Sequence, residues 1–323
     1  MRTGVAAVVT VMIGASTPAY GQTPIADHHQ HLFSPALAAL ISPAPPAAPI
    51  APVTAADLIT LLDAAGIRRA AVLSTAYIFE QPTRKVDNAR DKVRAENDWT
   101  SQQVAQYPER LVGFCGLNPL KDYALDELAR CAKDPNLRRG LKLHVGNSGV
   151  DYTDAQHVAR LRSVFRAANS YGMAIVIHMR ASFGQKLPYG REAALVLLNE
   201  LVPAAPDVPI QIAHLAGGGG PMDQAAHDAL DVLVDAISRG DPRTKPLWFD
   251  VTGMGTVPKM MPDELAYFAT KIRQIGVQRV IYGSDAPSGG NPPPQQAWAA
   301  FRKLPLSDEE FRTIAGNLAP YMQ

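Results

Sequence analysis

The chain has 323 residues, of which 47% are hydrophobic and 19% are charged, and its formal net charge is +1. This composition is ordinary for a globular protein that is long enough to bury a large core. The near-neutral charge, without a stripe of lysine and arginine between aromatic residues, argues against a nucleic-acid-binding protein and against binding to an anionic membrane surface.

Residues 1–21 read as a secretory signal peptide that precedes the folded domain. Arg2 supplies a minimal positive start, residues 5–15 form a short apolar run, and residues 19–21 (Ala-Tyr-Gly) offer small side chains to a signal peptidase. We therefore expect cleavage before Gln22 and a periplasmic or secreted protein. An uncleaved membrane anchor is the alternative, although the apolar run is short for a bilayer.

A proline-rich stretch at residues 42–52 is expected to be an extended loop, either a surface spacer or a lid beside a site. It follows a first predicted strand at residues 25–29. Apolar strands and amphipathic helices then alternate, beginning with a helix at 54–65 that has Thr54 as its N-cap and ends before Gly66. The other strands are predicted at 69–76, 111–117, 140–145, 173–178, 209–215, 247–251 and 279–283, and the other helices at 87–107, 123–133, 154–170, 191–201, 225–238, 262–275, 295–303 and 308–315.

Eight strands, each followed by a helix, indicate a single-domain α/β protein with a (β/α)8 TIM barrel spanning residues 22–323. A doubly wound open sheet is the alternative. The first predicted strand is not followed by the glycine-rich fingerprint of dinucleotide-binding proteins, which makes that alternative less favourable.

The sequence contains two cysteines, Cys115 in an apolar strand and Cys131 in a predicted helix. Two cysteines are too few for a disulfide framework, although a single bridge is feasible in an oxidising compartment. Because free thiols are common in buried apolar segments, we expect both cysteines to be unpaired.

Candidate metal ligands follow several of the predicted strands. In a β-strand alternate side chains share a face, so His29 and His31 point the same way and offer two imidazole nitrogens to a divalent metal. His178, His214 and Asp285 end three further strands, and residue numbers 31, 178, 214 and 285 differ by 147, 36 and 71. These separations are about four, one and two βα units, so all five side chains should converge at one mouth of the barrel.

The chain resembles the amidohydrolase superfamily, specifically the amidohydrolase-related (amidohydrolase 2) branch, which includes aminocarboxymuconate-semialdehyde decarboxylase and related lactonases. The resemblance extends over nearly the whole mature chain and rests on motifs in the correct order. They are Asp27-His28-His29-Gln30-His31, Gly140-Leu141-Lys142-Leu143-His144, Ile177-His178, Ala213-His214-Leu215-Ala216-Gly217 and Gly283-Ser284-Asp285-Ala286-Pro287.

The resemblance implies one divalent metal, usually zinc, held by His29, His31, His178 and Asp285. It places His214 beside the metal, where it polarises the substrate or orients water, and it makes Asp285 the general base that takes a proton from the attacking water. A carboxylate that touches both metal and water is suited to that proton transfer.

Three further residues are candidates for substrate binding. Elsewhere in the superfamily a carboxylated lysine at the position of Lys142 bridges two metals, but in this branch the lysine is normally unmodified, which implies a mononuclear site. His144 lies two residues further along the same strand face. Arg180 could pair with a substrate carboxylate or be an exposed rim residue.

We therefore expect an exported metal-dependent hydrolase that cleaves a lactone, ester or amide bond of a small molecule. One alternative is a non-oxidative decarboxylase of an unsaturated or aromatic acid, and another is a barrel that binds metal or a ligand without turnover. Asp285 argues against the latter, since a pure binding protein does not need a base. No nucleic acid or membrane partner is expected after signal cleavage, and a homodimer is compatible with the sequence.

Overall fold

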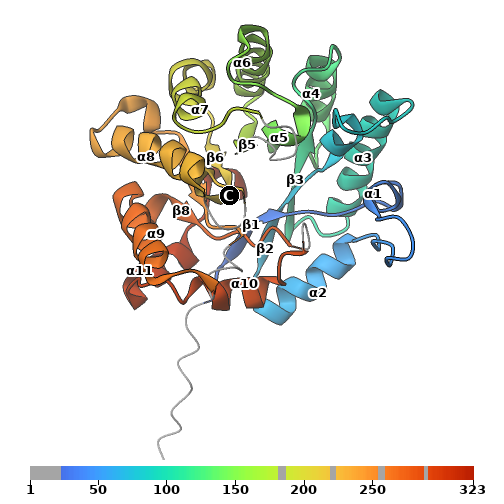
Figure 1. The fold of residues 1–323 in the computed structure, drawn as a ribbon. Helices are drawn as coiled ribbons and strands as arrows, with labels where there is room; N and C mark the ends of the chain where they lie inside the picture. The colour runs from blue at the N-terminus through green and yellow to red at the C-terminus, as the bar shows by residue number, and fades with distance from the viewer. Residues whose placement is uncertain (1–22, 181–186, 219–222, 254–258, 287–289) are drawn as a thin grey trace, which may run out of the picture.

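In the computed structural model the chain forms a ring of eight strands surrounded by helices (Figure 1). The structure describes residues 23–180, 187–218, 223–253, 259–286 and 290–323. The predicted signal peptide at residues 1–21 and its cleavage point lie outside these ranges, as does Pro287. Within the described residues, no helix is both long and apolar enough to span a bilayer.

The strands are all parallel and pair in sequence order, which confirms the predicted TIM barrel. They are β1 Ala26–Gln30, β2 Arg69–Leu73, β3 Leu111–Gly116, β4 Gly140–His144, β5 Ala174–His178, β6 Ile210–Ile212, β7 Leu247–Asp250 and β8 Val280–Ile281. The segment after β8 closes the ring on β1, where Asp285 N donates to His29 O at 2.8 Å and His28 N donates to Tyr282 O at 2.9 Å.

The helices surround the strands, and all but two short ones lie close to their predicted positions. They are α1 Pro35–Ile41, α2 Ala55–Ala65, α3 Ala89–Val104, α4 Ala124–Lys133, α5 Val145–Ser148, α6 Ala155–Ser170, α7 Arg191–Val196, α8 Gln224–Ser238, α9 Pro262–Ile275, α10 Pro294–Phe301 and α11 Asp308–Gly316. Helix α2 begins as expected, with a reciprocal capping box between Thr54 and Asp57, and Gly66 ends it in the left-handed conformation.

Helices α1 and α5 and the early end of strand β6 were not predicted from the sequence. Helix α1 lies just before the proline-rich loop, and Ser34 caps it by accepting a hydrogen bond from Leu37 N at 3.1 Å. Strand β6 ends at Ile212, three residues earlier than expected, because Ala213–Ala216 turn into a short 3-10 segment.

The prediction of two free thiols is wrong, because Cys115 and Cys131 form a disulfide. Cys115 lies on the outer face of β3 and Cys131 on the face of α4 that packs against it, with the two Cα atoms 6.0 Å apart. The same burial that suggested inert thiols therefore brings the two sulfur atoms together.

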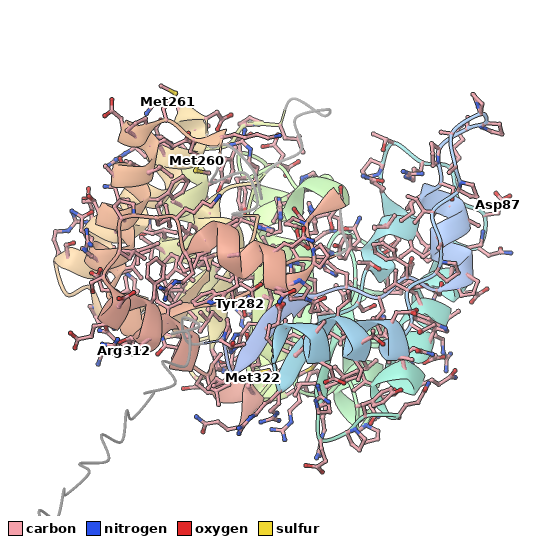
Figure 2. All side chains as sticks on the ribbon, turned by 90° about the horizontal axis from the view of Figure 1, so that it is seen from below. Asp87, Met260, Met261, Tyr282, Arg312 and Met322 are labelled. Carbon is pink, nitrogen blue, oxygen red and sulfur yellow. A yellow bond between two sulfur atoms is a disulfide. The ribbon has the colours of Figure 1, made fainter. Side chains whose placement is uncertain are left out.

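The lower part of the barrel interior is filled by apolar side chains from the strands and by the C-terminal tail. Phe114, Val176 and Ile281 pack there with Tyr321 and Met322. Gly140 makes room for the Phe114 ring, since an added Cβ would lie 2.0 Å from a ring carbon. In Figure 2, Met322 lies at the lower end of the molecule and Met260 and Met261 lie at the upper end.

Candidate active site and metal centre

The carboxyl ends of the strands surround a cavity of about 690 Å³. All of the predicted site residues except Arg180 line it. They come from β1, β4, β5 and the segments after β6 and β8, so the strand ends converge as their spacing in the sequence predicts. The polar side of the cavity includes His29, His31, Lys142, His144, His178, His214 and Asp285, and the apolar side includes Phe33, Ile41, Ile50, Val53 and Ile78.

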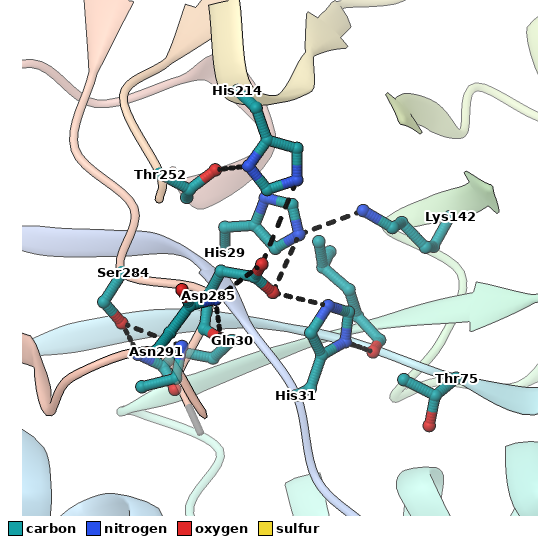
Figure 3. Close-up of polar contacts among 12 residues, drawn as sticks. His29, Gln30, His31, Thr75, Lys142, His214, Thr252, Ser284, Asp285 and Asn291 are labelled. Carbon is teal, nitrogen blue, oxygen red and sulfur yellow. Dashed lines mark hydrogen bonds and ion pairs between the residues drawn. The ribbon is translucent and has the colours of Figure 1, made fainter. Parts of the chain in front are cut away.

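The Asp285 carboxylate lies at the centre of the polar side (Figure 3). Its Oδ1 is 3.1 Å from His31 Nε2 and 3.6 Å from His29 Nε2, and its Oδ2 is 3.9 Å from His214 Nε2. Asn291 donates from Nδ2 to Oδ2 at 3.0 Å and so fixes the carboxylate. Three imidazole nitrogens therefore face one carboxylate, and the ligand atoms of His29, His214 and Asp285 are near enough to one another to share a single ion.

The hydrogen bonds made by the Nδ1 atoms of His29 and His31 determine which nitrogen of each ring carries the proton. His31 Nδ1 donates to the carbonyl oxygen of Leu73 at 2.7 Å, and His29 Nδ1 donates to Asp250 Oδ2 at 3.0 Å. Because a carbonyl and a carboxylate can only accept, the Nδ1 atoms carry the protons and the Nε2 atoms present lone pairs. Imidazoles oriented in this way by outer partners are typical of metal-ligating histidines.

Asp250, at the end of β7, is a central residue of the site that was not predicted from the sequence. Besides His29, its carboxylate accepts from Gln211 Nε2 at 2.6 Å, from His214 N at 2.7 Å and from Thr252 Oγ1 at 2.7 Å. The Thr252 hydroxyl is also hydrogen-bonded to His214 Nδ1. Since its proton goes to Asp250, Thr252 accepts from His214, which leaves His214 Nε2 unprotonated.

A signal for Asp250 was present in the spacing. It follows His214 by 36 residues, the length of one βα unit, and it ends an apolar strand, as the other site residues do. Asp250 is fully buried.

Burial favours the neutral form of the His29, His178 and His214 imidazoles, and the surroundings of Asp285 keep its carboxyl group ionised. Burial, with the nearby Lys142 ammonium, lowers the pKa of His29 to about 3, and burial also lowers the pKa of His178 and of His214. For Asp285, burial alone would raise the pKa, but the adjacent His29 and His31 hold it below the usual range of a carboxyl group. Neutral imidazoles with a carboxylate form a donor set that suits zinc and similar divalent ions.

The residues present therefore fit the metal that the family resemblance implies. The ligand atoms of His29, His214 and Asp285 all lie within 4.8 Å of one another, and His31 joins them through its contact with Asp285. His178 lies beside this group, with its ring centroid 4.8 Å from that of His214 and stacked on His144 at 3.9 Å. His29, His31, His178 and Asp285 remain the predicted ligands, with His214 close enough to contribute.

The backbone around two of these residues is held in a disfavoured conformation. His214, Leu215 and Ala216 have φ angles of 57°, 50° and 65°, and Asp285 has a φ of 58°. Non-glycine residues rarely adopt this left-handed region, and such residues gather at functional sites. Strain after β6 and after β8 is thus located where the predicted catalytic side chains enter the cavity.

Gly283, which precedes this strained turn, allows close packing of β8 against β1. A Cβ atom at this position would lie 2.5 Å from Thr252 Cγ2 and 2.8 Å from His29 Cβ. Both distances are shorter than van der Waals contact, so a side chain at Gly283 would displace His29.

The three predicted substrate-binding residues have different surroundings. Lys142 is buried, and its Nζ lies 3.0 Å from His29 Nε2, while burial lowers its pKa to about 8. His144 Nδ1 accepts from Asn147 N at 3.1 Å, which leaves Nε2–H free to donate into the cavity. Arg180 instead forms a bidentate pair with Asp223, with NH1 2.8 Å from Oδ1. Its two terminal guanidinium nitrogens thus already bind a carboxylate of the protein in place of one from a substrate.

The opposite wall of the cavity is apolar. Phe33, Ile41 and Val53 come from the segment around α1 and the proline-rich loop, and Ile78 comes from the short helix Ala76–Glu80 after β2. Ile50 of the loop also faces the cavity and is 38% exposed. The proline-rich loop therefore lies beside the site, as the second of its two interpretations predicted.

Comparison with solved structures supports this fold. Similar structures include a 5-carboxyvanillate decarboxylase from Sphingomonas paucimobilis, at 17% identity and a TM-score of 0.62, which covers 91% of this chain and 97% of that one. A probable 2-pyrone-4,6-dicarboxylic acid hydrolase from Acinetobacter baumannii has 18% identity and a TM-score of 0.58, covering 90% and 96%. A 2,6-dihydroxybenzoate decarboxylase from Rhizobium has 16% identity and a TM-score of 0.61, covering 91% and 96%.

At these identities the solved structures establish the shared fold and not a shared reaction. No curated protein matches the sequence. The amidohydrolase family model (Amidohydro_2), however, matches residues 26–317, which includes every strand of the barrel and all of the site residues described above. The chain belongs to the amidohydrolase family.

Proposed function

We propose that this protein is a metal-dependent hydrolase that cleaves a lactone, ester or amide bond of a small molecule. The observation that carries the proposal is the arrangement around Asp285. Unprotonated Nε2 atoms of His29, His31 and His214 face its ionised carboxylate at the base of the cavity. This arrangement can hold a divalent metal and leave a base beside it.

Each side chain then has a defined task. A divalent metal, for which we propose zinc, supplies Lewis-acid activation of water and of the substrate carbonyl when it is bound. Asp285 accepts the proton of the attacking water, because its low pKa keeps it ionised at neutral pH. His214 Nε2, which is unprotonated, accepts a hydrogen bond from that water and so orients it. His144 Nε2–H donates to a substrate oxygen on the polar side of the cavity.

The cavity walls indicate the substrate's shape. One side is made of Phe33, Ile41, Val53 and Ile78, so an apolar alkyl or aryl group would be buried there while the scissile carbonyl faces the histidines. Among the described lining residues there is no arginine on the apolar wall, and Lys142 contacts His29 deep in the site. This charge distribution favours an uncharged acyl substrate over one with several carboxylates.

Lys142 also supports a second candidate function, non-oxidative decarboxylation of an unsaturated or aromatic acid. A buried ammonium beside the metal site could bind the carboxylate of such an acid, and solved decarboxylases share this fold. Hydrolysis is preferred because the base and the oriented histidines suit water activation.

Export to the periplasm or outside the cell is part of the proposal, and so are a small-molecule substrate and the absence of nucleic-acid or membrane partners. The signal pattern at residues 1–21 supports export, and the formal net charge of +1 supports the partner assignment. Mass spectrometry of the exported protein should find a chain that begins at or near Gln22. Retention of Met1 would contradict cleavage.

The decisive experiment combines elemental analysis with a turnover screen of the purified mature protein. We expect about one zinc-like ion per chain, and hydrolysis of alkyl or aryl lactones, esters or amides. His29→Ala should release the ion while the barrel stays folded. Release of carbon dioxide from aromatic acids without hydrolysis would replace the proposal by the second candidate, and metal binding without turnover in either screen would leave the non-catalytic barrel.

A further inference from the structure

The C-terminal tail closes the end of the barrel that lies opposite the cavity. Residues Pro320–Met322 form a short 3-10 helix, and Tyr321 and Met322 are buried among Ala26, Phe114 and other residues of the lower core. Figure 1 places the C-terminus near the centre of the ring of strands. The tail is anchored there, because Ala319 N donates to His28 Nε2 at 3.3 Å.

A chain of buried hydrogen bonds runs from this tail to the metal site. The Tyr321 hydroxyl donates to Gln211 Oε1 on β6, and Gln211 Nε2 donates to Asp250 Oδ2 at 2.6 Å. The same Asp250 oxygen accepts from His29 Nδ1 at 3.0 Å. Tyr321 is 5% exposed, and Gln211, Asp250 and His29 are completely buried. This chain of four residues, each from a different element, thus connects the end of the barrel opposite the cavity with His29, a predicted metal ligand.

The hydroxyl of Tyr321 fixes the orientation of the Gln211 amide. An amide presents a donor on one side and an acceptor on the other, and Asp250 can use only the donor. A hydroxyl proton aimed at Oε1 stabilises the orientation in which Nε2 points toward Asp250. Gln211 Nε2 is also 3.3 Å from the carbonyl oxygen of His28, which favours the same orientation.

We propose that Tyr321 is a positioning residue for the metal site, acting through Gln211 and Asp250 on His29. The proposal rests on the metal site of the proposed function and extends it to a residue near the C-terminus. We call the hydrogen-bonded chain Tyr321–Gln211–Asp250–His29 the relay. With the relay intact, Asp250 is held where it accepts a hydrogen bond from His29 Nδ1, and His29 Nε2 presents its lone pair to the metal. Without the hydroxyl, the Gln211 amide can rotate and Asp250 is held less firmly.

The test is Tyr321→Phe, which removes one oxygen atom and keeps the ring that packs edge-on against Phe114 at 5.0 Å between centroids. Zinc affinity of the full mature chain is measured by chelator competition. Loss of an outer partner of a metal ligand typically lowers affinity about 10–100-fold, and Tyr321 is more remote, so we expect a decrease of about tenfold. The visible spectrum of the cobalt(II) form, which reports ligand geometry, should change as well.

A second substitution separates positioning from a general effect on folding. In a Gln211→Met background the relay is already broken, so adding Tyr321→Phe should change zinc affinity less than about twofold. The matched control is Tyr171→Phe, because Tyr171 borders the same surface pocket as Tyr321 but is 47% exposed and outside the relay. It should leave both the affinity and the cobalt spectrum unchanged.

The outcomes distinguish this inference from the proposed function. If the wild-type protein binds zinc and Tyr321→Phe binds it within twofold as tightly, with an unchanged cobalt spectrum, the positioning role is refuted and the proposed function stands. The positioning role is also refuted if Tyr321→Phe lowers only the melting temperature, or if it has an equal effect with Gln211→Met present. A wild-type protein that binds no divalent metal overturns both.

Discussion

Replacing Asp250 by asparagine should damage both the metal site and the stability of the metal-free protein. The Asp250 carboxylate accepts from four partners at 3.0 Å or less, two at each oxygen. An asparagine has one acceptor oxygen and one NH2 group. Whichever way the side chain is turned, its NH2 group would therefore face two hydrogen-bond donors that now contact a carboxylate oxygen of Asp250. If the NH2 group faces His29, the imidazole must move its proton to Nε2 and so loses the lone pair that faces the metal.

The size of the effect follows from these contacts. A hydrogen bond to a charged group contributes about 1.5–3 kcal/mol, so two lost bonds correspond to about 3–6 kcal/mol before relaxation. Because His29 can change its tautomer, we expect the lower end, about 3 kcal/mol. Zinc affinity should fall by about 100-fold, the upper end for an outer partner, because Asp250 orients His29 directly and His214 through Thr252.

Two measurements check this prediction. Urea unfolding of the metal-free protein at pH 7 gives the change in the free energy of unfolding, and chelator competition gives the change in zinc affinity. Asp231→Asn is the matched control, because Asp231 also accepts hydrogen bonds but its side chain is 44% exposed. An Asp250→Asn protein that loses less than about 1 kcal/mol and binds zinc within about threefold of wild type would refute the assignment.

Three further predictions concern the base, the turn after β8 and the disulfide. Asp285→Asn should lower kcat by about 100-fold or more at saturating zinc, and if His214→Asn alone is inactive under the same conditions, the roles of the two residues are reversed. Gly283→Ala should cost about 1–3 kcal/mol of stability and weaken zinc binding, because its Cβ would meet a side-chain carbon at 2.5 Å; unfolding identical to wild type would contradict the close packing. Changing Cys115 and Cys131 to alanine should lower the free energy of unfolding by about 3 kcal/mol, the value for a loop of this length. If reducing the wild-type protein does not lower its unfolding midpoint, the disulfide contributes nothing to stability.

The architecture could be predicted because its signals repeat along the chain. Apolar strand and amphipathic helix alternate at a nearly constant interval, and a closed parallel barrel is the arrangement that buries all of these strands. Helix α2 shows that local signals were also reliable, since Thr54 and Gly66 begin and end it as expected. Helix α1 was missed because seven residues before a run of prolines carry too little periodicity to be recognised.

The disulfide was missed for a different reason. Whether two cysteines pair depends on the distance between a strand and the helix that follows it, and spacing along the sequence does not determine that distance. Buried free thiols and a buried disulfide have the same apolar surroundings in the sequence. Only the packing of α4 on β3 distinguishes them.

The candidate site shows the same division between residues that point at the ligand and residues that support them. His29, His31, His178, His214 and Asp285 could be predicted to meet at one cavity because strand ends converge in a barrel, and they were selected as candidates because chemistry limits which side chains bind a metal. The supporting residues are chosen by geometry, and many side chains can accept or donate a hydrogen bond. Asp250 had a detectable signal in its spacing, whereas nothing local marks Gln211 or Tyr321.

The positions of these supporting residues suggest why the strained turns are stable. His214 and Asp285 have left-handed backbone conformations, each of which costs about 1–2 kcal/mol for a residue with a side chain. The surrounding contacts offset this strain, since His214 N donates to Asp250 and Asp285 N donates to the carbonyl oxygen of His29. The backbone of each strained residue is thus held by a group that also forms or orients the metal site. Removing Asp250 would release the turn at His214 and the orientation of His29 together, so the stability of the turn and the affinity for metal should fall in parallel across variants of the relay.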